Sequence, residues 1–209
     1  DRHDDQWRWV AEKGKNGLEF SPMPRDRDQA FFLNEGFFPK IASRKWANPK
    51  FQGFGYELKN VNGFMFNGRY FDRSFMNELD LKDWEEEIDQ LLPKLTEDAV
   101  AGAFQDWPKE VAVQDAPEIQ AKLLARKSWL KEKALEYYNF LAEEVDVVGS
   151  NKNEEFEIKH LPNGRIDVEV RKINKEGQLE HKVYSRTFNP QETKEIRLYG
   201  LEGEDRFVW

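Results

Sequence analysis

The stretch FEIKHLPNGRIDVEV, residues 156–170, decides the fold class of the C-terminal part of this chain. Apolar residues alternate with charged ones before the turn signal at 162–164 and again from 166 to 170. Alternation with a period of two on both sides of a turn predicts a β-hairpin with one buried face. Similar alternation at 179–188 and 196–198 extends this hairpin to an antiparallel β-meander.

The segment preceding this meander, from about residue 72 to 145, has a helical period. Leu81, Trp84, Ile88 and Leu91 share one helix face. Asp80 is placed as the N-cap of that helix and Pro93 ends it, while Thr96 can cap a second, shorter helix that stops before Pro108.

A third helix is expected to start at Asp115, with Pro117 in its first turn. An apolar stripe then runs from Ile119 to Val145, with a break near Ser128. Such a stripe is typical of the core-facing side of a long helix.

The first part of the chain, residues 1 to about 75, begins with another hairpin signal. Apolar residues alternate from Trp7 to Ala11, a turn signal occupies 14–17, and the alternation resumes up to Pro24. Residues 51–71 are punctuated by Gly and Asn and are expected to form loops with short extended pieces. The sequence therefore predicts an α+β fold: an irregular β-hairpin start, a helical middle and a C-terminal antiparallel β-meander.

Composition restricts the functions that the chain can have. The 209 residues include 14% aromatics, which argues for a globular fold although 34% of residues are charged. A net charge of −8 with dispersed Lys and Arg gives no basic footprint for nucleic acid. The absence of Cys excludes disulfides and Cys-ligated zinc, and no stretch has the apolar length of a transmembrane helix.

Two short motifs in the first part of the chain could carry chemistry. The run DRHDDQ, residues 1–6, resembles the catalytic loop of phosphatidylinositol kinases, of which spore-coat and secretory-pathway kinases carry variants. The resemblance implies that Asp1 acts as the base on the attacking hydroxyl and that Gln6, where the family has Asn, is a magnesium ligand.

The second motif is PRDRDQAF, residues 24–31, which resembles the metal-binding segment of spore-coat-type kinases. Asp26, Asp28 and Phe31 match that pattern, and Arg25 replaces its Trp. The resemblance implies that Asp26 is a metal ligand and Asp28 a secondary one. A hairpin between the two motifs is the connection that the resemblance requires.

The resemblance also has implications for the whole chain. It implies Mg and ATP as cofactors of the full-length protein, and it makes residues 1–145 a mainly helical kinase-like C-lobe segment, followed by an antiparallel β domain at 146–209. In such kinases the lobe before the catalytic loop holds the phosphates. Because nothing precedes Asp1 here, we expect this isolated chain to be inactive and to bind no cofactor tightly.

Residues 24–31 and 186–207 together resemble a segment of large surface-associated, calcineurin-like phosphoesterase-linked proteins of the Bacteroidetes. This resemblance implies a periplasmic or outer-membrane associated location, with neighbouring domains of the same protein as partners. The alternative is a non-enzymatic structural or interaction module of a surface protein.

A third hypothesis comes from the aromatic run between Phe31 and Tyr56. These rings could form a surface on which sugars stack, although packing into the core is expected for most of them. Exposure of several aromatic side chains on one face would favour glycan binding, and their burial would eliminate it. His160 and His181 lie in the predicted sheet and are expected to be structural.

Overall fold

The computed structural model describes residues 3–15, 17–34, 36–44 and 46–209, and the chain has the α+β fold expected from its sequence. It divides into two compact units. The first unit comprises Asp1–Phe71 and Glu85–Tyr137, and the second comprises Asp72–Trp84 and Tyr138–Trp209. The boundaries of these units differ from the predicted division at residue 145. Residues 72–84, from the helical middle of the chain, belong to the same unit as the C-terminal strands.

The chain begins with a short 3-10 helix, η1 (Asp4–Gln6), and a β-hairpin of strands β1 (Trp7–Gly14) and β2 (Gly17–Pro24). The strands pair antiparallel from Trp7 opposite Pro24 to Gly14 opposite Gly17, which confirms the predicted hairpin. Gly17 has φ +142°, a conformation that favours glycine. The ring of Trp7 stacks on Phe71 with centroids 5.1 Å apart.

Short helices follow the hairpin: α1 (Phe37–Ala42), η2 (Pro49–Phe51), α2 (Val61–Phe64), η3 (Phe66–Gly68) and α3 (Arg69–Phe75). The expectation of loops at 51–71 therefore holds for residues 52–60 and was wrong for 61–71, which are largely helical. Asn60 is the reason for α2, because its Oδ1 accepts a hydrogen bond from Gly63 N at 2.9 Å and caps the helix. Asn favours both loops and N-caps, so composition alone could not separate the two.

The middle of the chain is helical, with α4 (Leu81–Leu91), η4 (Leu92–Lys94), α5 (Glu97–Gly102), α6 (Lys109–Arg126) and α7 (Leu130–Ala142). Both predicted N-caps are confirmed. Asp83 N donates to Asp80 Oδ1 at 3.1 Å, and Ala99 N donates to Thr96 Oγ1 at 3.1 Å. The predicted break near Ser128 is also confirmed.

The predicted start of the third helix at Asp115 was wrong, because α6 begins at Lys109 and continues through Pro117. Proline removes one helical hydrogen bond but leaves the flanking turns intact. Packing of α6 on α5 outweighs that loss, since Ala116 is buried against Val100 and Phe104.

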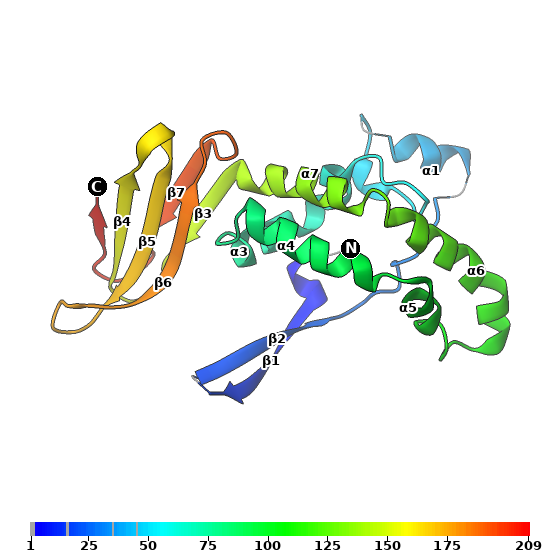
Figure 1. Ribbon diagram of the computed structural model, residues 1–209, viewed down its shortest axis with the longest axis horizontal. Coiled ribbons are helices and arrows are strands. Elements are labelled where there is room, and N and C mark those ends of the chain that lie inside the picture. The colour runs from blue at the N-terminus through cyan, green and yellow to red at the C-terminus, as the bar shows by residue number, and fades with distance from the viewer. Residues whose placement is uncertain (1–2, 16, 35, 45) are drawn as a thin grey trace. The chain divides into compact units, whose positions relative to one another are not determined.

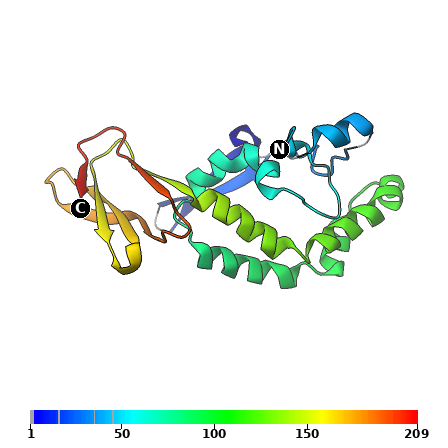
Figure 2. The same cartoon turned by 90° about the horizontal axis from the view of Figure 1, so that it is seen from above.

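Residues 85–91 of α4 and 130–137 of α7 belong to the first unit and run side by side, as Figure 2 shows in green and yellow-green. Lys131 Nζ on α7 binds both carboxylate oxygens of Asp89 on α4, at 2.7 and 2.8 Å. The apolar stripe predicted for α7 ends earlier than expected, because Val145 lies in a strand.

The second unit holds strands β3 (Glu144–Val148), β4 (Glu154–His160), β5 (Ile166–Ile173), β6 (Leu179–Phe188), β7 (Glu195–Tyr199) and β8 (Arg206–Val208), with η5 (Pro162–Gly164) in the β4–β5 turn. Strands β4, β5 and β6 form the antiparallel meander, and β8 adds to β4 in parallel (Figure 1). Strands β3 and β7 form a separate parallel pair, from Glu144 opposite Glu195 to Val148 opposite Tyr199.

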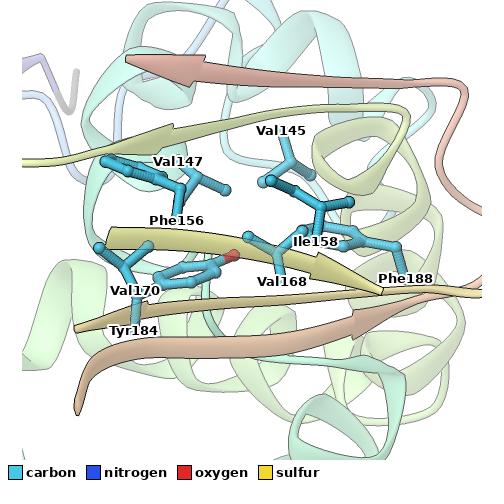
Figure 3. Packing of buried hydrophobic residues seen from close by; sticks show 8 residues of the cluster. All are labelled: Val145, Val147, Phe156, Ile158, Val168, Val170, Tyr184 and Phe188. Carbon is cyan, nitrogen blue, oxygen red and sulfur yellow. The ribbon is translucent and has the colours of Figure 1, made fainter. Parts of the chain in front are cut away.

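The core of the second unit lies between the β3–β7 pair and the meander (Figure 3). Its buried residues are Val145, Val147, Phe156, Ile158, Val168, Val170, Tyr184 and Phe188. Strands β3 to β6 contribute these residues from alternating positions, as the period-two pattern of the sequence requires. Phe156 is fully buried and stacks on Phe207 of β8, with ring centroids 4.7 Å apart.

Candidate functional site

The open end of the β1–β2 hairpin is where the two motifs meet. Backbone N–H of Arg25 donates to Gln6 O at 2.8 Å, which extends the pairing of Trp7 with Pro24 by one residue. Gln6 and Asp26 therefore lie side by side although they are 20 positions apart in the sequence. The hairpin thus supplies the connection that the two motifs require.

The side-chain amide of Gln6 is buried and has two possible orientations. In one, Nε2 donates to Asp26 Oδ2 at 3.5 Å, a long hydrogen bond, while Oε1 faces backbone carbonyls. In the other, Nε2 donates to Arg25 O at 2.8 Å and to Asp26 O at 3.1 Å. The second orientation makes two good hydrogen bonds, so we assign it to the protein.

This orientation has a chemical consequence for the neighbouring carboxylate. Gln6 Oε1 then takes the place of Nε2, about 3.5 Å from Asp26 Oδ2. A carbonyl oxygen and a carboxylate oxygen then lie near each other at the end of the hairpin. Carbonyl and carboxylate oxygens are the ligands that hard divalent cations prefer.

The backbone at Asp26 is held in an unusual conformation, with φ +48°. Asp tolerates the left-handed region better than most residues, and such conformations cluster at functional sites. The side chain is exposed, so its carboxylate can adjust to a ligand.

Asp28 lies in the turn that follows, and its side chain is also exposed. The neighbouring guanidinium of Arg27 lies over the Trp7 ring, 4.9 Å from its centroid. Asp1, the predicted base, lies outside the described residues.

The donor set at this place is small. Within the part of the chain that the structure describes, no group of three or more His, Cys, Asp or Glu side chains could hold a metal ion. Magnesium does not require one, because it is commonly held by one or two carboxylates, with waters and substrate phosphates completing its octahedron. The structure brings Gln6 and Asp26 together, and Asp28 lies two residues further along the chain.

The sequence did not indicate a buried polar network in the second unit. Arg186 on β6 is 6% exposed, and its Nη1 donates to Asn77 O at 2.7 Å. Its Nη2 donates to the Tyr138 hydroxyl at 3.3 Å, and that hydroxyl donates to Glu192 Oε2 at 2.6 Å. Tyr184 also donates to Asn77 O, at 2.9 Å.

Little free space lies beside this network. The cavity beside it, lined by Arg186, Tyr138 and Asn77 among others, has a volume of about 20 Å³. That is room for about one water molecule and not for a substrate. Alternation on β6 was a usable signal, because it places Arg186 between Tyr184 and Phe188 on the buried face.

Comparison with known proteins adds no relative from which a function could be transferred. No protein-family model, no curated protein sequence and no solved structure matches the chain. None of the helices in the described part of the chain combines the length and apolar character needed to cross a bilayer. The geometry of the hairpin end is thus the basis for a functional proposal.

Proposed function

We propose that the chain carries the magnesium site of a kinase-like phosphotransferase of the cell envelope. The observation that carries this proposal is the meeting of Gln6 Oε1 and Asp26 Oδ2 at the end of the hairpin. The order of the two motifs and the hairpin between them give it further support. Its envelope location rests on the resemblance of residues 24–31 and 186–207 to surface-associated proteins.

Each residue has a role in this proposal. Asp26 and Gln6 supply one oxygen each to the ion, and the exposed carboxylate of Asp28 is a secondary ligand. Oxygen ligands of an octahedral magnesium ion lie roughly 3 Å apart, so the observed separation has to shrink by about half an ångström. Exposure of Asp26 allows that adjustment. The ion would neutralise nucleotide phosphate charge, and Asp1 would accept the proton of the attacking hydroxyl.

Metal titration of this chain tests the proposal. Isothermal titration calorimetry should show saturable Mg²⁺ binding that weakens about tenfold or more in Asp26→Asn, because one of two charged ligands is lost. Gln6→Glu should bind more tightly, since it adds a charge to the same position. Asp106→Asn, which alters an exposed carboxylate elsewhere in the first unit, is the matched control and should bind like the parent.

Location of the ion can be checked with Mn²⁺ as a paramagnetic probe. It should broaden the backbone NMR signals of Gln6 and Asp26 before those of other residues. Absence of saturable Mg²⁺ binding, or equal binding in Asp26→Asn, would reject the site and leave a non-enzymatic module. Binding of Ca²⁺ without Mg²⁺ would reject the phosphotransferase chemistry.

A further inference from the structure

A second candidate site is a cavity of about 350 Å³ in the first unit. The loop after β2, helix η2, and the segment from α2 to η3 contribute its walls. Its lining includes Phe32, Phe51, Phe64, Lys50, Gln29 and Gln52. Its volume lies in the range of small-molecule pockets, which combine aromatic walls with a few polar groups.

The aromatic walls of this cavity are exposed rather than packed in a core. Phe32, Phe51 and Phe64 are 46%, 48% and 40% exposed. Burial of these rings would have eliminated a sugar-binding surface, and they are not buried. Flat apolar ring faces flanked by amide side chains suit a ligand with both C–H faces and hydroxyl groups, as a sugar has.

The loops that form the cavity are held by hydrogen bonds. Gln52 Nε2 donates to Asn60 O at 2.7 Å, and Asn60 N donates to Gln52 Oε1 at 3.0 Å. Phe54 N donates to Phe32 O at 2.6 Å. At Gly53 a Cβ atom would lie 2.7 Å from Asn34 N, so the two loops approach closely only because this residue is glycine. A cavity formed in advance lowers the entropy cost of binding.

Lys50 supplies the charge of the cavity. Its ammonium group lies 5.4 Å from the centroid of the Phe51 ring. No carboxylate among the described residues forms an ion pair with it, although the chain as a whole carries a net charge of −8. A cation at the edge of an aromatic wall is suited to a ligand that carries a carboxylate.

We propose that this cavity binds an acidic sugar, of the uronic acid type, as a unit of a glycan. The sugar ring lies against the phenylalanine side chains, and its carboxylate pairs with Lys50. Side-chain amide groups of the lining form hydrogen bonds with the hydroxyl groups of the sugar. The proposed sugar binding requires no metal ion, so it can be tested with all divalent cations removed.

The test compares methyl glucuronide with methyl glucoside, which differ in the carboxylate alone. With EDTA present, saturation-transfer NMR should detect methyl glucuronide on the chain, and its affinity should exceed that of the glucoside by at least about fivefold. Lys50→Gln should remove this preference, and Phe51→Ala should weaken both ligands by about fivefold or more. Phe38→Ala is the matched control, because Phe38 is 80% exposed and lies outside the cavity lining.

Several results would overturn the proposal. They are no methyl glucuronide binding to the parent chain, equal affinity for the two glycosides, or an unchanged preference in Lys50→Gln. Thermal unfolding of each variant separates loss of binding from loss of fold. If Phe51→Ala unfolds, the result for Lys50→Gln decides, since that change replaces an exposed charge by an amide of similar length.

Discussion

Two buried phenols give the molecule a pH dependence at the residue scale. Burial, followed by the hydrogen bond to Glu192, raises the pKa of Tyr138 well above its ordinary value. Burial also raises the pKa of Tyr184. In both cases the folded state favours the protonated phenol. The stability that these groups contribute is present below the unfolded pKa of about 10 and is lost as the pH rises above it.

We therefore expect the free energy of unfolding to fall above about pH 10. Absorbance of tyrosinate should show that Tyr138 and Tyr184 are deprotonated only when the chain unfolds. In Tyr138→Phe one tyrosine fewer should be protected in this way, and the variant should lose about 1–2 kcal/mol at neutral pH because Glu192 loses its donor. Normal titration of all six tyrosines in the folded chain would contradict the argument.

Much of the candidate site could be predicted from single residues. The two motifs and the hairpin signal between them predict that Gln6 and Asp26 meet, and the structure brings the two side chains together. The orientation of the Gln6 amide could not be predicted, because it depends on where the carbonyls of Arg25 and Asp26 point. The same is true of the left-handed backbone at Asp26, since Asp adopts many other conformations.

The start of α4 shows how one element is fixed by its cap. Asp83 N donates to Asp80 Oδ1, and Asp80 N donates to Asp83 Oδ2 at 2.9 Å, so the two residues cap each other. We expect Asp80→Ala to lower the free energy of unfolding by about 1 kcal/mol, measured by urea denaturation. Asp80→Ser should retain most of the stability, because Ser is also an N-cap residue. Equal losses in both variants would argue against capping.

Prediction of elements succeeded where a period was long and clear, and failed where local signals were ambiguous. The strands from β4 to β6 and the caps of α4 and α5 followed from the sequence. Pro117 indicated a helix start, but packing of Ala116 against α5 carries the helix across it. The parallel pairing of β3 with β7 has no local signal, since it depends on which strands the shared core brings together.

At the scale of the whole molecule, the second unit has its own core although two separate stretches of chain form it. The two stretches join at Trp84 and Tyr138, whose ring centroids are 5.8 Å apart. The axes of neighbouring packed helices lie roughly 10 Å apart, and a linker of a few glycines can span such a gap between residues 84 and 138. Replacing residues 85–137 by such a linker should therefore leave a folded protein.

Circular dichroism and thermal unfolding check this prediction. The shortened chain should keep its strand signal and unfold in one cooperative transition, with Tyr138 and Tyr184 still protected from titration. Phe156→Ala in the shortened chain should abolish cooperative unfolding, because it removes about 3–5 kcal/mol from a small core. Non-cooperative unfolding of the shortened chain itself would show that the second unit needs residues 85–137.

The parallel pair β3–β7 has a consequence for the order of folding. Val145 lies opposite Ile196, so the meander lies between the two strands in the sequence. Closing so long a loop before the meander has formed costs entropy that a single strand pair cannot repay. Hairpins of the meander close short loops and gain their contacts early. We therefore expect β3, which directly follows α7 in the sequence, to pair with β7 only after the three strands between them, β4, β5 and β6, have paired.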